Sequence, residues 1–197
     1  MKKKLGQNFL RNIEISESIV ELSKFEKDID IMEIGPGDGA LTDFLVEKYK
    51  NITLLEFDSD LITPLSNRYK KYNVKIIHED ARTYKVRSNS KINIIGNLPY
   101  YASNIIIRNF MSQENVNSMV FTVQKEVGEQ IVAGTGKKSF LSLLIQSFSD
   151  VEKLLIIKNH EFYPIPKVDS MTVKITPKNV KIDNDYVEFL KKGFSNP

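Results

Sequence analysis

The chain alternates short apolar runs with longer segments of helical periodicity, and no other feature limits its fold as strongly. The apolar runs are typical of buried strands and fall at residues 29–34, 52–57, 74–77, 92–95 and 118–123. The helical segments between and after them fall at 40–49, 61–72, 104–111 and 125–132. Parallel strands need crossover connections, usually helices, which cover both faces of the sheet. The alternation therefore predicts an α/β fold with a mostly parallel sheet and helices on both faces.

The two ends of the chain depart from this alternation. Further helices are predicted at 13–25, 139–148 and 185–192. Asn12 or Ser16 is placed to cap the first of them, because a short polar side chain accepts a hydrogen bond from a free backbone N–H of the first turn. Two strands, at 154–158 and 171–176, have a proline-containing loop between them and no helix. This arrangement favours an antiparallel hairpin at the edge of the sheet.

Composition excludes several classes of protein. The 197 residues contain no cysteine, which rules out a disulfide scaffold, a zinc ribbon and a cysteine nucleophile. No apolar run approaches the roughly 18 residues of a membrane span, and the basic N-terminus has no apolar segment behind it. We therefore expect a cytoplasmic protein without a membrane partner. The net charge of +3 is only weak evidence for a nucleic-acid partner.

A glycine-rich stretch, EIGPGDG at residues 33–39, lies between a predicted strand and a predicted helix. Glycine lets the backbone turn tightly and pass close to a ligand. The spacing is not that of G-x-G-x-x-G, and no lysine follows at the P-loop position, which argues against a phosphate cradle. A purely structural turn is the alternative interpretation of this stretch.

Two acidic residues follow the next two predicted strands. Glu56 comes 21 positions after Gly35, which is where a carboxylate accepts hydrogen bonds from both hydroxyls of a ribose. Asp80 comes after the third predicted strand, where it could accept the exocyclic amine of an adenine or simply cap a helix. Together with the glycines, these residues outline a nucleoside-binding cleft at the carboxyl ends of the strands.

The stretch GNLPY at residues 96–100 follows the fourth predicted strand. Pro99 fixes its own backbone and restricts Leu98 to extended conformations, which directs the Asn97 amide into the cleft. Tyr100 offers a flat face on which a base could stack. A plain turn after a strand is the alternative for this stretch taken alone.

In this order, these motifs resemble those of class I S-adenosylmethionine-dependent methyltransferases that modify the N6 amine of adenine. LGQNFL at residues 5–10, QKEV at 124–127 and FYPIPKVDS at 162–170 resemble motifs of the ribosomal RNA adenine dimethyltransferases. The resemblance runs from about residue 5 to residue 177. It implies a Rossmann-like fold, with S-adenosylmethionine as cofactor, S-adenosylhomocysteine as product and no metal.

The resemblance also implies a set of site residues. Those expected to bind the cofactor are Asn8, Leu10, Gly35, Gly37, Glu56, Asp80 and Asn97. Those expected to act in catalysis are Asn97, Leu98, Pro99, Tyr100 and Phe162, with Tyr100 and Phe162 stacking on the target adenine. Basic residues expected to contact RNA phosphates are Lys2, Lys3, Lys4, Arg11, Lys137, Lys138 and Lys167.

Three functions are compatible with this family. The motifs at residues 5–7, 124–127 and 167–170 favour the branch that dimethylates two adjacent adenosines near the 3′ end of small-subunit rRNA. The alternatives are a macrolide-resistance type enzyme that modifies large-subunit rRNA, and a non-catalytic factor of ribosome assembly. The expected partner is small-subunit rRNA or a pre-30S particle, bound by a monomer.

The chain departs from the family pattern in three places. Residues 101–103 read YAS where the family usually has Asn-Ile-Ser, and Glu129-Gln130 replace a usual basic residue. Residues 1–180 are expected to form the catalytic domain. Residues 181–197 are expected to begin a C-terminal helical region whose remainder is absent from this chain.

Overall fold

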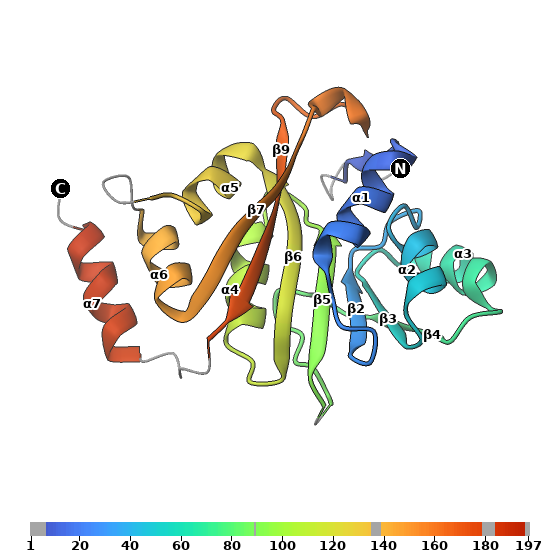
Figure 1. Cartoon of the computed structure of the whole chain (residues 1–197), viewed down its shortest axis with the longest axis horizontal. Helices are drawn as coiled ribbons and strands as arrows, with labels where there is room; N and C mark the ends of the chain where they lie inside the picture. The colour runs from blue at the N-terminus through green and yellow to red at the C-terminus, as the bar shows by residue number, and fades with distance from the viewer. Residues whose placement is uncertain (1–6, 89, 135–138, 179–183, 196–197) are drawn as a thin grey trace.

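A computed structural model describes residues 7–88, 90–134, 139–178 and 184–195. Its main sheet has seven strands in the order β4-β3-β2-β5-β6-β9-β7 (Figure 1). The strands of this sheet are β2 (Asp30–Ile34), β3 (Ile52–Glu56), β4 (Val74–His78), β5 (Ile92–Asn97), β6 (Val116–Gln124), β7 (Ser149–Ile157) and β9 (Ser170–Pro177). β2 to β6 pair in parallel, whereas β9 is antiparallel to both β6 and β7. The predicted mostly parallel sheet with an antiparallel edge hairpin is confirmed.

Helices cover both faces of the sheet and connect the parallel strands, except that the described residues between β4 and β5 form no helix (Figure 1). They are α1 (Ile13–Ser23), α2 (Thr42–Lys48), α3 (Ser59–Tyr69), α4 (Ser103–Met111), α5 (Lys125–Ile131), α6 (Phe140–Phe148) and α7 (Asn184–Ser195), with a short 3-10 turn η2 (Asn159–Glu161). Within the described ranges, none of the helices is long and apolar enough to cross a membrane.

The core consists of two apolar clusters, one on each face of the sheet. One face packs against α4, α5 and α6, and its cluster includes Phe110, Phe121 and Ile145. The other face packs against α1, α2 and α3. Neighbouring residues of β5 illustrate the division, because Ile94 belongs to the first cluster and Ile95 to the second. Burial on both faces explains why the parallel strands are continuous apolar runs in the sequence.

The helix boundaries differ from those predicted by up to three residues. The side chain of Asp58 accepts a hydrogen bond from Asp60 N, so α3 begins at Ser59, two residues before the predicted start, and Pro64 lies inside the helix. α7 extends through Gly193 to Ser195. Of the two caps proposed for α1, the structure shows Asn12, whose Oδ1 accepts from Ile15 N at 3.2 Å.

α7 packs against α6. Its Tyr186 shares a hydrogen bond with Ser147 at 2.9 Å, and the ring of Tyr186 lies edge-on to that of Phe148 with centroids 5.8 Å apart. Leu190 is buried in the cluster that α4, α5 and α6 form with the sheet. The described part of the predicted C-terminal region is thus joined to the same core as the preceding helices.

A second, two-stranded sheet joins segments far apart in the chain. β1 (Phe9–Leu10) pairs antiparallel with β8 (Phe162–Tyr163). The pairing is extended by hydrogen bonds from Arg11 N to Glu161 O at 2.8 Å and from Asn12 Nδ2 to Glu161 Oε2 at 2.9 Å. We call residues 7–12 the N-terminal strap, because these contacts hold it across the carboxyl ends of the strands.

The carboxyl ends of β2 and β5 approach each other so closely that Gly96 has no space for a side chain. A Cβ at this position would lie 2.5 Å from the backbone oxygen of Ile34. Since that oxygen belongs to the sheet, it cannot move aside as a flexible side chain would. Gly96 therefore determines how close Asn97, the next residue, lies to the glycine-rich loop after β2.

We predict that Gly96→Ala lowers the free energy of unfolding by about 1–3 kcal/mol, because the added methyl group forces β2 and β5 apart. The urea midpoint measures the loss. Gly134→Ala is the matched control, since a Cβ there meets nothing within 4 Å. Equal midpoints for the two variants would contradict the proposed contact.

Candidate active site

A cleft lies at the carboxyl ends of the parallel strands, where the N-terminal strap crosses them. It is lined by all but one of the residues expected to bind cofactor or act in catalysis. Those that line it are Asn8, Leu10, Gly35, Gly37, Glu56, Asp80, Asn97, Leu98, Pro99 and Tyr100. They come from the strap and from the ends of β2, β3, β4 and β5. Residues at the ends of successive strands, although far apart in the sequence, thus lie along a single ligand site.

The glycine loop adopts a backbone conformation that side chains disfavour. Gly35, Gly37 and Gly39 have φ values of 64°, 60° and 94°. A Cβ on Gly37 would lie 2.9 Å from the ring of Phe9 in the strap, and one on Gly39 would lie 2.1 Å from the hydroxyl of Tyr69. The loop is therefore both a tight turn and a surface that neighbouring groups approach closely.

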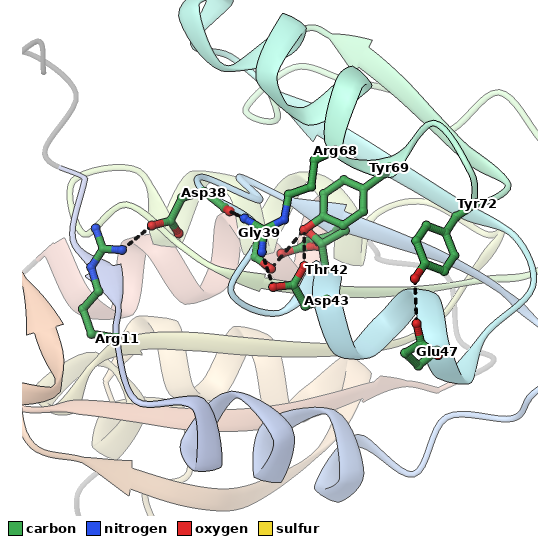
Figure 2. A network of polar contacts seen from close by, with 10 residues as sticks. Arg11, Asp38, Gly39, Thr42, Asp43, Glu47, Arg68, Tyr69 and Tyr72 are labelled. Carbon is green, nitrogen blue, oxygen red and sulfur yellow. Dashed lines mark hydrogen bonds and ion pairs between the residues drawn. The ribbon is translucent and has the colours of Figure 1, made fainter.

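Side chains from α3 and from the strap hold the outer side of this loop (Figure 2). Arg68 Nη1 donates to the backbone oxygen of Asp38 at 2.8 Å, and the same guanidinium forms an ion pair with Asp43. Tyr69 donates its hydroxyl to Asp43 Oδ1 at 2.7 Å. Burial and the neighbouring Asp43 raise the pKa of Tyr69 above its usual range, so the hydroxyl keeps its proton as a donor. Arg11 of the strap reaches the Asp38 carboxylate from the opposite side.

Glu56 is buried at the end of β3, with 3% of its surface exposed. Its Oε1 accepts hydrogen bonds from the backbone N–H groups of Phe57 and Asp58 at 2.8 and 2.7 Å, and its Oε2 accepts from Gly37 N at 3.3 Å. Burial raises the pKa of Glu56, while these three backbone donors oppose the rise. The carboxylate is thus held by the backbone between the glycine loop and β3, with the acceptor oxygens that a ribose requires.

Glu33 belongs to the cleft although the sequence analysis gave it no role of its own. It is 2% exposed, and Thr42 Oγ1 donates to its Oε2 at 2.6 Å. Burial raises the pKa of Glu33 to about 8, and the nearby carboxylates of Glu56 and Asp43 add to the rise. In the sequence, Glu33 stands out only as an acidic residue inside an apolar strand, just before the glycine loop.

Asp80 is paired with Arg82, a residue that the sequence analysis did not select. Arg82 Nη2 lies 2.6 Å from Asp80 Oδ2, and this pair holds the pKa of Asp80 below its usual value. The backbone oxygen of Asp80 accepts from the N–H groups of Thr83 and Tyr84 at 3.1 and 2.9 Å. Asp80 therefore begins a tight turn, and it does not cap a helix.

The Asn97 and Tyr100 side chains are each held by a partner from a distant part of the chain. Asn97 Nδ2 donates to Asn8 O at 2.9 Å, which leaves Oδ1 at the opposite end of the planar amide. The Tyr100 hydroxyl shares a hydrogen bond of 2.8 Å with Ser170, a fully buried residue at the start of β9. Burial raises the pKa of Tyr100. Leu98 N donates to Thr122 O at 3.0 Å, so the backbone between these side chains is tied to β6.

Phe162 is the one residue predicted to bind cofactor or act in catalysis that does not line the cleft. Its ring is 2% exposed and packs in the cluster with α1, α2 and α3. Successive residues of a strand point to opposite faces, so Phe162 points into the core and Tyr163, 60% exposed, points outward. This placement does not agree with the stacking role expected for Phe162.

The basic residues predicted to contact RNA divide into three groups. Arg11 is engaged within the protein, in an ion pair with Asp38 and against the rings of Phe9 and Tyr163 at 5.4 and 6.0 Å. Lys167 is exposed on the loop before β9. The others lie outside the described residues, namely Lys2, Lys3, Lys4, Lys137 and Lys138. Among the described residues, no group of three metal-ligating side chains is placed to hold a metal.

The fold and this cleft together define a class I S-adenosylmethionine-dependent methyltransferase, in which a glycine loop and two acidic strand ends face an Asn-x-Pro-Tyr motif. Among solved structures, a dimethyladenosine transferase from Plasmodium falciparum matches with a TM-score of 0.87 and 28% identity, covering 95% of this chain and 71% of that one. The 23S rRNA methyltransferase ErmE has a TM-score of 0.84 over 95% of this chain and 79% of its own. Its 22% identity supports likeness of fold alone.

The family model for ribosomal RNA adenine dimethylases matches residues 1–193, and the chain belongs to that family. A curated relative from Hydrogenobaculum, named ribosomal RNA small subunit methyltransferase A, is 39% identical over 99% of this chain and 79% of its own length. A relative of the same name from the aster yellows witches'-broom phytoplasma is 35% identical over 98% of this chain and 76% of its own.

We predict that Glu33→Gln removes a decline in stability that the native protein shows at rising pH. The pKa of Glu33 rises from 4.5 to about 8 on folding, so the folded protein binds this proton more tightly than the unfolded chain. Its contribution is therefore complete below about pH 4.5 and is lost as the pH rises through about 8. Glutamine keeps an oxygen to accept from Thr42 and does not ionise.

Urea unfolding from pH 5 to about pH 9 tests this, with an expected gain for Glu33→Gln on the order of a few kcal/mol at the alkaline end. Glu152→Gln is the control, because Glu152 is exposed on β7. Parallel pH profiles for native protein and Glu33→Gln would show that Glu33 is ionised throughout.

Proposed function

We propose that this protein transfers methyl groups from S-adenosylmethionine to the N6 amines of two adjacent adenosines near the 3′ end of small-subunit rRNA. The product is N6,N6-dimethyladenosine, formed during maturation of the small subunit on rRNA or a pre-30S particle in the cytoplasm. The observation that carries the proposal is the position of Asn97, at the edge of a cleft that also contains Glu56 and the glycine loop. The names of the curated relatives support the small subunit as the target.

The residues of the cleft fit S-adenosylmethionine by their chemistry. The backbone at Gly35 and Gly37 provides the close approach needed under the amino-acid portion, and a Cβ on Gly37 would crowd this space. Glu56 would accept from the ribose hydroxyls, and Asp80 from the amine of the cofactor's adenine. Asn8 and Leu10 of the strap would close over it. When bound, the cofactor supplies an electrophilic methyl group on a positively charged sulfur.

The chain's own groups would activate the target amine by orientation. The lone pair of adenine N6 is delocalised into the ring, which makes the nitrogen a poor nucleophile. Hydrogen bonds from N6–H to Asn97 Oδ1 and the Leu98 carbonyl would favour a pyramidal nitrogen with its lone pair free. The cofactor would supply its methyl group to this lone pair and keep the electron pair of the carbon–sulfur bond, while a proton of N6 would pass to water. Positioning and fixed dipoles would supply most of the rate.

The structure favours Tyr100 as the platform for the target base. Its ring borders the cleft and its hydroxyl is held by Ser170, so the ring keeps one orientation. A base leaving its stack costs a few kcal/mol, and stacking on an aromatic ring returns about 1–3 kcal/mol. We assign this role to Tyr100 alone, because Phe162 is buried in the core.

One experiment distinguishes this function from its two alternatives. The protein is incubated with labelled S-adenosylmethionine and with unmethylated 30S or 50S particles, and the modified adenosines are mapped. We expect label in two adjacent adenosines of the 30S particle. Label confined to the 50S particle would establish the macrolide-resistance type instead. RNA binding without any transfer would establish a non-catalytic assembly factor.

We predict that Asn97→Ala slows methyl transfer by about 10²–10³-fold, because a dipole aimed at the reacting amine is lost. The affinity for S-adenosylhomocysteine should fall by less than about tenfold, through loss of the hydrogen bond to Asn8. Single-turnover transfer and calorimetry measure the two quantities. A collapse of cofactor affinity with an unchanged transfer rate would assign Asn97 to cofactor binding instead.

Glu56→Ala should show the opposite pattern. We expect cofactor affinity to fall by more than about tenfold, because the ribose hydroxyls lose a charged acceptor. Glu152→Ala, at an exposed position of β7, is the control for removing a carboxylate. An affinity equal to that of the control would exclude Glu56 from the site.

A further inference from the structure

Both oxygens of the Asp80 carboxylate accept hydrogen bonds from a single neighbour. Arg82 Nε lies 3.0 Å from Oδ1 and 2.9 Å from Oδ2, and Nη2 lies 2.6 Å from Oδ2. The backbone N of Arg82 adds a contact to Oδ1 at 2.9 Å. Two carboxylate oxygens offer about four lone-pair positions. Arg82 supplies three N–H donors, from Nε, Nη2 and the backbone, and therefore occupies most of these positions, so an adenine amine has to compete with it.

This pair lies inside the cofactor cleft. Asp80 and Arg82 both line it, and their side chains are 25% and 40% exposed. Phe57, next to Glu56, lines the same part of the cleft with 49% of its surface exposed, and its ring centre lies 6.0 Å from the guanidinium of Arg82. A guanidinium that leaves Asp80 thus has an aromatic face beside it on which to rest.

We propose that Arg82 competes with the cofactor's adenine for Asp80, as a built-in cap on the adenine end of the cleft. The inference rests on the proposed function, which assigns Asp80 to that amine. An incoming 6-amino group displaces the Arg82 side chain and takes its place on the carboxylate. Because S-adenosylmethionine and S-adenosylhomocysteine carry the same adenosine, Arg82 weakens the binding of both.

Weaker product binding suits a dimethyltransferase. Each target adenosine receives two methyl groups, so S-adenosylhomocysteine must leave before the second transfer. A cap that returns to Asp80 speeds this departure. The partial exposure of the pair keeps it weak, because water and salt screen a surface ion pair. The cofactor therefore loses only a few-fold in affinity to the competition.

The test is the affinity of Arg82→Gln for S-adenosylhomocysteine, measured by calorimetry at low ionic strength. We expect binding about two- to fivefold tighter than in the native protein, which corresponds to removal of an exposed ion pair. Arg87→Gln is the matched control. Arg87 forms an exposed ion pair with Glu79 at 2.9 Å and approaches the Tyr84 ring at 5.9 Å, in the same segment of chain.

A second arm varies salt with the native sequence, and so does not depend on any substitution. Raising ionic strength toward about 1 M shortens the Debye length to about 3 Å and weakens the pair. We expect the affinity of the native protein for S-adenosylhomocysteine to rise toward that of Arg82→Gln, whose own affinity stays flat. Arg82→Lys, which keeps the charge without the planar fork, should lie between the two.

Two results would overturn the inference. One is an Arg82→Gln affinity equal to or weaker than that of the native protein, with Arg87→Gln unchanged. It would leave the proposed function intact, because the native protein still binds the product. The other is failure of the native protein to bind S-adenosylhomocysteine at all, which would overturn the proposed function and this inference together.

Discussion

The contact on which the site depends is the parallel pairing of β2 with β5. The connection after β2 leads to β3 on one side, whereas β5 lies on the other side and leads on to β6. The chain therefore leaves these two neighbouring strands in opposite directions, which opens a crevice between their carboxyl ends. The glycine loop forms one wall of this crevice and Asn97 the other. Gly96 sets the distance between the walls, because it places the two backbones in direct contact.

The rest of the site is assembled from segments that lie far away in the sequence. The strap reaches the crevice by pairing with β8, and Ser170 reaches it from the antiparallel edge. Polar side chains of α3 reach the glycine loop from a third direction, through Arg68 and Tyr69. The groups with proposed chemical roles thus sit on strand ends, and their orientation is set by contacts with other segments of the chain.

The sequence was sufficient where local pattern determines structure. Apolar runs, the glycines of the loop and the position of Glu56 follow from strand burial and from the fixed spacing of a strand–helix–strand unit. It was insufficient where tertiary contacts decide. The hydrogen bond of Tyr100 depends on Ser170, 70 residues later in the chain, and the burial of Phe162 depends on its register with β1. Neither contact has a signature in the local sequence.

The hydrogen bond from Asn97 to Asn8 fixes the orientation of the Asn97 side-chain amide. The nitrogen and oxygen of such a group differ little in size, and rotation by half a turn exchanges a donor for an acceptor. Because the Asn8 carbonyl accepts only from the nitrogen, the strap fixes which end of the Asn97 amide remains for another partner. The polarity of this amide is thus decided by the backbone of a segment 89 residues earlier in the chain. In the proposed reaction, an amide turned by half a rotation would present a donor to an amine that needs an acceptor.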